Sequence, residues 1–293
     1  FGRSILADQL PSLIISGFLR EGSSHYQLLF TRWLLEILML ANETNDIETA
    51  DIVRPHVPKL LTACEFFKIE LGNGQFLIPS IGDISPDADL DWLSKMHSSA
   101  LLTDNPSGHQ KGWALLFPSA CSLQIQYKKR IDGWNLFAKA GWYRLDCFGW
   151  TAIWHAKDSV GKAIASHAHH DFGSLVLYRN GKEVLIDAGS YDYSNSAIAN
   201  YGVSAKAHNT TTLDGYPAML SCRDKFLPSK YRDAISEVKY QQINEIGQVS
   251  VQFRHNGFAR LGAGVDWHTR TFTFCQMAFS IEDSFEGRGR FWM

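Results

Sequence analysis

The first part of the chain places its hydrophobic residues at the spacing of α-helices. Ser24 and Gln27 fit a capping box, with Ser24 as the N-cap and Gln27 at the third helical position. The apolar face of this helix comprises Leu28, Leu29, Trp33, Leu34, Ile37, Leu38 and Leu40. A second helix is expected from residue 47 to 69 and a third from 89 to 102. Antiparallel helices joined by short loops predict a helical array or toroid.

From residue 133 onward the hydrophobic positions fall in short stretches separated by turn residues, which is typical of β-strands. Asn180-Gly181 lies between two of these stretches and predicts a tight hairpin. The strands are expected at residues 142–145, 166–178, 183–191, 209–213, 234–240, 248–254 and 269–274. We therefore predict an α+β protein of two domains, α-helical over residues 1–105 and an antiparallel β-sandwich over residues 106–293.

Histidines and carboxylates concentrate in the β half, at His167, His169, Asp171, Asp187 and His208. On a strand the first three would point to one face, because successive side chains alternate. The hairpin that follows would return Asp187 beside this strand, and His208 would open the next strand. Two imidazoles and one carboxylate form a favourable Zn²⁺ donor set, so His169, Asp187 and His208 are the candidate metal ligands. His167 is then left to act on a substrate.

Composition narrows the possible functions. The net charge of −2 and the sequence pI of about 6.6 do not favour nucleic-acid binding. No apolar run reaches the ~18 residues of a membrane span. The five cysteines lack paired spacing, so neither a disulfide framework nor a zinc knuckle is expected. The chain begins at Phe1 without a methionine and ends at Met293 soon after a predicted strand, so we expect a fragment truncated at both ends.

Taken together, several stretches resemble the heparinase II/III-like family. Residues 166–171 read Ser-His-Ala-His-His-Asp, where the family usually has HAHAD. Residues 181–191 are similar to its G-x-x-x-L-x-D-P-G-T-Y stretch, and residues 207–215 to its HNT-x-x-x-D-G stretch. In the helical half, residues 17–26 resemble its E-x-S-x-x-Y segment, and Ile-Gly-Asp at residues 81–83 is similar as well. The resemblance thus covers most of the chain.

This resemblance implies a polysaccharide lyase with an incomplete α/α toroid, an antiparallel β-sandwich and an active site in the cleft between them. Such enzymes cleave uronate-containing glycans by β-elimination. A base removes the proton at C5 and an acid protonates the oxygen that leaves C4. On this resemblance His169, Asp187 and His208 match the metal ligands. The metal, expected to be Zn²⁺, either polarises the substrate or holds the hairpin and the His208 strand together, and the resemblance favours the structural role.

The resemblance also assigns roles to the remaining candidate residues. The catalytic residues that it implies are Tyr26, His167 and Tyr191. The candidate substrate-binding residues are Glu21, His25 and Asn209, together with Lys206, which departs from the family pattern and is either a substitute ligand for the acidic sugar or a solvated lysine. The partner implied is an acidic polysaccharide, and the location implied is the periplasm or the outside of the cell.

Three features depart from the family pattern. The Asn-His dipeptide that neutralises the substrate carboxylate is absent before Phe18. Ala188 stands where proline is usual, and Ala205-Lys206-Ala207 stands where a stretch with arginine is usual. Either the Asn-His segment belongs to a missing N-terminal portion, or the activity is lost.

Three functions remain open at this point. The first is a lyase acting on a glycosaminoglycan, alginate or another uronate-containing glycan. The second is a non-catalytic glycan-binding or assembly protein on the same scaffold. The third is a hydrolase that uses metal-bound water.

Overall fold

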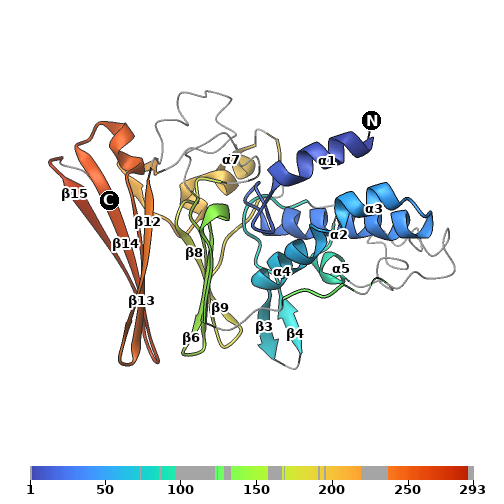
Figure 1. Cartoon of the computed structure of the whole chain (residues 1–293). Coiled ribbons are helices and arrows are strands. Elements are labelled where there is room, and N and C mark those ends of the chain that lie inside the picture. Colours follow the sequence, from blue (N-terminus) through green and yellow to red (C-terminus); the bar gives the residue numbers. More distant parts are fainter. Residues whose placement is uncertain are drawn as a thin grey trace.

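The computed structural model describes residues 2–72, 74–85, 88–96, 123, 125–128, 133–157, 167, 169–190, 192–194, 196–218 and 237–289. Within this part of the chain, α-helices precede two large antiparallel sheets (Figure 1). The protein therefore has the mixed helical and antiparallel β composition that the sequence predicts. The expected domain boundary between residues 105 and 106 lies outside the described residues.

The described N-terminal part consists mainly of α-helices. They are α1 (Gly2–Leu13), α2 (Ser24–Glu43), α3 (Ile47–Val53), α4 (Val57–Phe67) and α5 (Leu90–Ser94). Two small hairpins lie among them, β1 (Ile14–Ile15) with β2 (Phe18–Leu19), and β3 (Ile69–Gly72) with β4 (Gln75–Leu77). Leu34, Leu38, Val53 and Leu60 form part of a buried core between α2, α3 and α4. None of the helices described is long and apolar enough to cross a membrane.

The start of α2 differs from the predicted capping box by one residue. Ser23, not Ser24, is the N-cap, and its Oγ accepts a hydrogen bond from the Tyr26 N–H at 3.0 Å. Gln27 does not close the box, because its Oε1 accepts a hydrogen bond from the Leu19 N–H at 2.6 Å. The Gln27 side chain is therefore used in a tertiary hydrogen bond and does not complete the capping box.

The predicted helix from residue 47 to 69 is two helices, α3 and α4, separated at residues 54–56. Pro55 lies in this break, where it has no backbone N–H to continue the helical ladder. Pro58 is tolerated because it falls in the first turn of α4. The third predicted helix is the short α5, and residues 97–102 of that prediction lie outside the described residues.

The first large sheet has strand order β5-β6-β7-β8-β9, and all neighbours are antiparallel. Its strands are β5 (Trp134–Phe137), β6 (Trp142–Cys147), β7 (Trp150–His155), β8 (Ser174–Arg179) and β9 (Lys182–Leu185). The second has order β12-β13-β14-β15, again antiparallel. Its strands are β12 (Val238–Glu245), β13 (Gln248–His255), β14 (Val265–Cys275) and β15 (Phe279–Gly287).

In sequence, short elements that lead to the candidate site lie between the strands of the first sheet and those of the second. They are α7 (Ala197–Val203), the 3₁₀ helix η3 (Ala205–Ala207), β10 (Thr212–Leu213) and β11 (Tyr216–Pro217). Two further 3₁₀ helices are η2 (Ala138–Ala140) and η4 (Gly257–Leu261).

The β5–β9 sheet is the middle layer of the molecule, with the helices on one face and the β12–β15 sheet on the other (Figure 1). Trp154 packs with Phe253 and Phe272 in the core between the sheets. On the opposite face Trp142 packs with Phe67 in the core beneath the helices. Burial on both faces explains why β7 and β8 are almost continuously apolar rather than alternating.

Several strand predictions need correction. The strand expected at residues 166–178 begins only at Ser174, and the described residues between His167 and Gly173 form an irregular loop. Gly173 has φ +66°, a left-handed conformation that ends any extended run there. His208 does not open a strand, because it follows η3. The strands β5 and β7 were not predicted, since their apolar residues alone do not distinguish strand from helix.

The Asn180-Gly181 hairpin forms between β8 and β9, with an irregular register. Arg179 pairs with Lys182, but a register shift between Leu177 and Tyr178 follows. Beyond Leu185 the chain leaves the sheet, so Asp187 lies in an extended segment after β9. The Asn-Gly turn specifies the strand pairing at the adjacent residues, but it does not specify the pairing as far away as Asp187.

A row of hydrogen bonds in the inter-sheet core predicts a pH effect on stability. The Nδ1 of His255 accepts a hydrogen bond from the Gly257 N–H, and its Nε2 lies 2.8 Å from the Nδ1 of His268. The Nε2 of His268 lies 2.7 Å from Asp283. Burial lowers the pKa of His255 well below 6.5, and the positive charges of His268 and Arg270 lower it further.

We expect the free energy of unfolding to fall as the pH drops below about 6.5. The unfolded chain then protonates His255 while the folded chain does not, so the unfolded state binds more protons, at about 1.4 kcal/mol per pH unit. His255→Gln does not titrate there. In urea unfolding it should lose less stability than the wild type between about pH 7 and about pH 5. An equal loss in both proteins would contradict this expectation.

Candidate active site and metal centre

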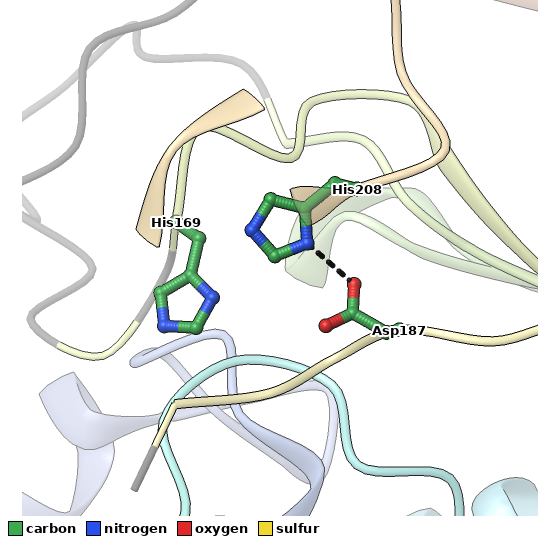
Figure 2. Close-up of side chains that lie close together, drawn as sticks. All are labelled: His169, Asp187 and His208. Carbon is green, nitrogen blue, oxygen red and sulfur yellow. Dashed lines mark hydrogen bonds and ion pairs between the residues drawn. The ribbon is translucent and has the colours of Figure 1, made fainter. Parts of the chain in front are cut away.

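His169, Asp187 and His208 meet in a buried cluster although they come from separate segments (Figure 2). His169 lies in the loop before β8, Asp187 follows β9, and His208 follows η3. One potential ligand atom from each residue lies within 4.8 Å of the other two. The residues are 1%, 7% and 7% exposed, so any ion held here would be shielded from bulk solvent.

The hydrogen bonds of this cluster leave two imidazole nitrogens available. The Nδ1 of His208 lies 2.9 Å from the Oδ2 of Asp187, and the Nε2 of His169 lies 2.8 Å from the Oδ1 of Asp83. The Nε2 of His208 and the Nδ1 of His169 are buried and have no hydrogen-bond partner among the described residues. Figure 2 shows one ring nitrogen of His169 facing the other two residues. Buried imidazole lone pairs beside a carboxylate fit a Zn²⁺ site.

The electrostatics of His208 favour a positive charge at this point. Burial acts to lower the pKa of His208, but the hydrogen bond and charge of Asp187, together with the charge of Asp171, raise it. A cation bound here would replace that proton, so metal binding should weaken as the pH falls.

Asp83 connects the cluster to a second group of polar side chains. Its Oδ1 lies 2.8 Å from the Nε2 of His169 and its Oδ2 lies 3.1 Å from the Nδ1 of His167. Asp83 is 1% exposed. One buried carboxylate from the N-terminal part of the chain therefore accepts a hydrogen bond from each of two histidines of the β half.

The backbone around Asp83 holds this carboxylate in place. The Asp83 N–H donates to the His167 carbonyl at 3.0 Å, and Asp83 forms an isolated parallel bridge with Ser190. The hydroxyl of Ser23, the N-cap of α2, donates to the Asp83 carbonyl at 2.7 Å. Gly82 has φ +77°, and a Cβ there would lie 2.8 Å from the His167 carbonyl oxygen. A glycine is therefore needed for the two segments to approach this closely.

The second group of side chains is partly open to solvent. The rings of Tyr26 and His167 stack, with centroids 4.0 Å apart and planes inclined by 6°. The Tyr26 hydroxyl lies 2.7 Å from the hydroxyl of Tyr193, and the Nε2 of His167 lies 3.2 Å from Glu21. Because each ring nitrogen of His167 faces a carboxylate oxygen, the orientation of the imidazole is restrained from both sides. Two phenols and an imidazole in contact are suited to proton transfer.

A serine-rich turn positions Tyr193. The Asp192 carboxylate accepts hydrogen bonds from the Ser194 N–H at 2.7 Å and from the hydroxyl of Ser196 at 2.7 Å. Ser196 in turn caps the N-terminus of α7, which leads through η3 to His208. Tyr191, the tyrosine expected at the site, lies outside the described residues.

Two of the candidate substrate-binding residues, His25 and Asn209, form hydrogen bonds with backbone groups of the protein. His25 is 1% exposed, its Nε2 donates to the Ala88 carbonyl at 2.7 Å, and its Nδ1 accepts from the Ser85 N–H at 3.3 Å. The amide of Asn209 donates to the carbonyls of Leu175 at 2.9 Å and Ile186 at 2.8 Å. Both side chains are committed to hydrogen bonds within the protein, so the structure does not offer them to a substrate.

The other two candidates are accessible. Glu21 lies against His167, with a side chain that is 24% exposed. Lys206 is exposed on η3, two residues before His208.

Sequence reasoning missed two residues of this site. Asp83 was noticed only as part of an Ile-Gly-Asp loop, and nothing local shows that it meets histidines some 80 residues later, at separations of 84 and 86 residues. Tyr193 was passed over for Tyr191, its neighbour two positions earlier. A glycine beside an aspartate in a loop was the available signal for Asp83, since such glycines often mark a close backbone approach.

The cluster makes a direct prediction about metal binding. Zn²⁺ should raise the melting temperature of the wild-type protein, because an ion that binds only the folded state stabilises it. His208→Ala should abolish this rise, since it removes one of three ligands. His170→Ala, a change one position beyond His169, should retain it. A rise of equal size in His208→Ala would place the Zn²⁺ elsewhere.

Comparison with known proteins agrees with this architecture. The chain is similar to the crystal structure of heparan sulfate lyase HepC from Pedobacter heparinus, with a TM-score of 0.63 and 18% identity. It is also similar to the heparinase III-BT4657 gene product, with a TM-score of 0.63 and 16% identity. Each match covers 98% of this chain and 41% of the other, so the chain spans about two fifths of the length of these proteins.

At such identities the structural likeness shows the fold. A comparison with curated proteins gives no match. The model of the heparinase II/III-like C-terminal family matches residues 132–290, which is more than half of the chain. The protein therefore belongs to the heparinase II/III-like family.

Proposed function

We propose that the protein is a polysaccharide lyase, or a portion of one, that cleaves an acidic uronate-containing glycan by β-elimination. The observation that carries this proposal is the stack of Tyr26 on His167 with the Tyr193 hydroxyl 2.7 Å from that of Tyr26. Membership of the heparinase II/III-like family, and the structural likeness to a heparan sulfate lyase, support the same reaction class.

The reaction needs two proton transfers and no redox step. The C5–H bond of the uronate breaks, its electron pair forms the C4=C5 double bond, and the bond from C4 to the glycosidic oxygen breaks. A base takes the C5 proton and an acid protonates the departing oxygen. Negative charge develops on the uronate carboxylate as the proton leaves, so a positive group must lie nearby.

The described side chains fit these tasks. We propose that the Tyr26 hydroxyl transfers the proton, with the Tyr193 hydroxyl as its hydrogen-bond partner. His167 stacks on Tyr26 and would stabilise charge on the phenol or relay the proton. Lys206, exposed on η3, is our candidate for binding an acidic sugar. Glu21 holds the outer nitrogen of His167 at 3.2 Å.

We propose that His169, Asp187 and His208 hold Zn²⁺ and that its role is structural. A bound Zn²⁺ supplies positive charge that offsets the buried carboxylate of Asp187. The three ligands come from the loop before β8, the segment after β9 and the turn after η3. Holding these segments together fixes the base of the loop that carries His167.

The burial of the cluster favours a lyase over a hydrolase. A hydrolase of this kind needs metal-bound water that can reach the glycosidic bond. His169 is 1% exposed and Asp187 is 7% exposed, whereas the Tyr193 ring, at 53%, is open to solvent. The accessible side chains that we propose for catalysis are therefore the phenols of Tyr26 and Tyr193 and the imidazole of His167.

We further propose that the helices belong to an incomplete α/α toroid and that the two sheets form a β-sandwich, with the division near residue 105. The packing of both sheets on one core is consistent with this architecture. We also propose that the protein acts in the periplasm or outside the cell, where acidic polysaccharides are degraded.

The lyase proposal is tested by the absorbance of the unsaturated uronate product. The protein is incubated with heparan sulfate, hyaluronan, alginate and glucuronan in separate reactions. We expect a rise with at least one glycan, reduced about 100-fold or more by Tyr26→Phe and by His167→Gln. Tyr216→Phe, a matched change at an exposed tyrosine on β11, should leave the rate unchanged.

Two outcomes would contradict the proposal. New reducing ends that form without a rise in absorbance, and that are lost on chelation of the metal, would favour a hydrolase. Binding of a glycan without any rise in absorbance would favour a non-catalytic binding protein.

Tyr193 provides a separate prediction about the second phenol. Tyr193→Phe removes the hydroxyl that lies 2.7 Å from the Tyr26 hydroxyl, while the exposed ring can remain. We expect kcat to fall about 10-fold or more with little change in KM, because the lost contact serves proton transfer. The pH–rate profile should shift as well. A higher KM with unchanged kcat would show that Tyr193 only binds substrate.

A further inference from the structure

The carboxylate of Asp83 determines which nitrogen of His169 is available. Since Asp83 has only acceptor oxygens when ionised, the Nε2 of His169 must carry the hydrogen of their 2.8 Å contact. The lone pair of this imidazole then resides on Nδ1, the buried nitrogen that has no hydrogen-bond partner among the described residues. Carboxylates that fix the tautomer of a ligating histidine in this way strengthen metal binding.

The other oxygen of Asp83 acts in the same way on His167. The Nδ1 of His167 donates to Oδ2 at 3.1 Å, which directs Nε2 toward Glu21 and the ring face toward Tyr26. One carboxyl group thus orients the imidazole of the candidate catalytic residue and that of a candidate metal ligand.

The position of Asp83 is restrained by the backbone rather than by its side chain alone. Its N–H donates to the His167 carbonyl, and its carbonyl accepts from the Ser23 hydroxyl. On the following residue, the Ile84 N–H donates to the Ser190 carbonyl at 2.8 Å. Because this backbone is fixed, the planar carboxylate can respond to a change at His169 only by turning as a unit, which would also change its hydrogen bond to His167.

We infer that Asp83 is a positioning residue that couples occupation of the metal site to the orientation of His167. The inference rests on the proposed function for the Zn²⁺ site and for the catalytic role of His167. Asp83→Asn is the informative substitution, because an asparagine has one acceptor oxygen and its NH₂ group would face the N–H of the other histidine.

The first test is a Zn²⁺ titration of metal-free protein. We expect Asp83→Asn to weaken Zn²⁺ binding about 10- to 100-fold relative to the wild type. Asp283→Asn is the matched control, since Asp283 also accepts a hydrogen bond from a histidine Nε2, at 2.7 Å, but in the core between the sheets. It should leave the affinity unchanged. Equal affinities of Asp83→Asn and Asp283→Asn would overturn the inference.

The second test follows the ring nitrogens of His167 in long-range ¹H–¹⁵N spectra. Addition of Zn²⁺ should shift these signals in the wild type and in Asp283→Asn, but not in Asp83→Asn. A wild-type His167 that does not respond to Zn²⁺ would overturn the coupling, and this arm remains decisive if Asp83→Asn fails to fold.

The outcome separates this inference from the lyase proposal. At saturating Zn²⁺, Asp83→Asn should retain a lower kcat with KM unchanged, because His167 stays misoriented. A wild type that binds no Zn²⁺ would overturn the coupling and the metal assignment, yet a rise in product absorbance would still support the lyase. A wild type that couples Zn²⁺ to His167 but yields no product would support the inference and contradict the lyase.

Discussion

The carboxylate of Asp83, 1% exposed, accepts hydrogen bonds from His169 on one oxygen and from His167 on the other. These bonds join a loop of the helical part to the loop that precedes β8. A buried carboxylate is costly unless its lone pairs are satisfied, and here two imidazole N–H groups satisfy them. The partly exposed pair Tyr26 and His167 and the buried cluster of His169, Asp187 and His208 thus share one anchoring point.

The burial pattern assigns different tasks to the two groups. His169 and Asp187 are shielded by protein, which strengthens their interactions with each other and with any cation. Tyr26, His167 and Tyr193 are at least partly exposed, which fits their proposed role in binding and cleaving a glycan. In the proposed function, a structural cation bound to the buried group would hold the loop of His167, which has no secondary structure of its own.

Sequence reasoning was most reliable where chemistry and local pattern coincide. The donor set His169, Asp187 and His208 was chosen by residue type and order, and the structure brings these three together. The expected secondary structure around them was wrong, since all three residues lie in loops and not on paired strands. Tertiary hydrogen bonds hold these loops in place, and the periodicity of the sequence does not reveal them. For example, the Asn209 amide donates to the carbonyls of both Leu175 and Ile186.

The residues that were missed or misassigned depend on contacts between distant segments. Asp83 and His25 lie in or near short motifs, yet their roles are set by partners about 60 to 86 positions away in sequence. Periodicity predicts which face of an element is buried, and it carries no information about which loop meets that face.

Diffraction from crystals grown with Zn²⁺, measured at the zinc absorption edge, tests the account most directly. We predict one strong anomalous peak bonded to the Nδ1 of His169, to Asp187 and to His208, with Asp83 still hydrogen-bonded to His169 and His167. A peak at another site would contradict the account. So would a Zn²⁺ ion bound directly by Asp83 or by the Nε2 of His169, because the carboxylate would then no longer link the two histidines.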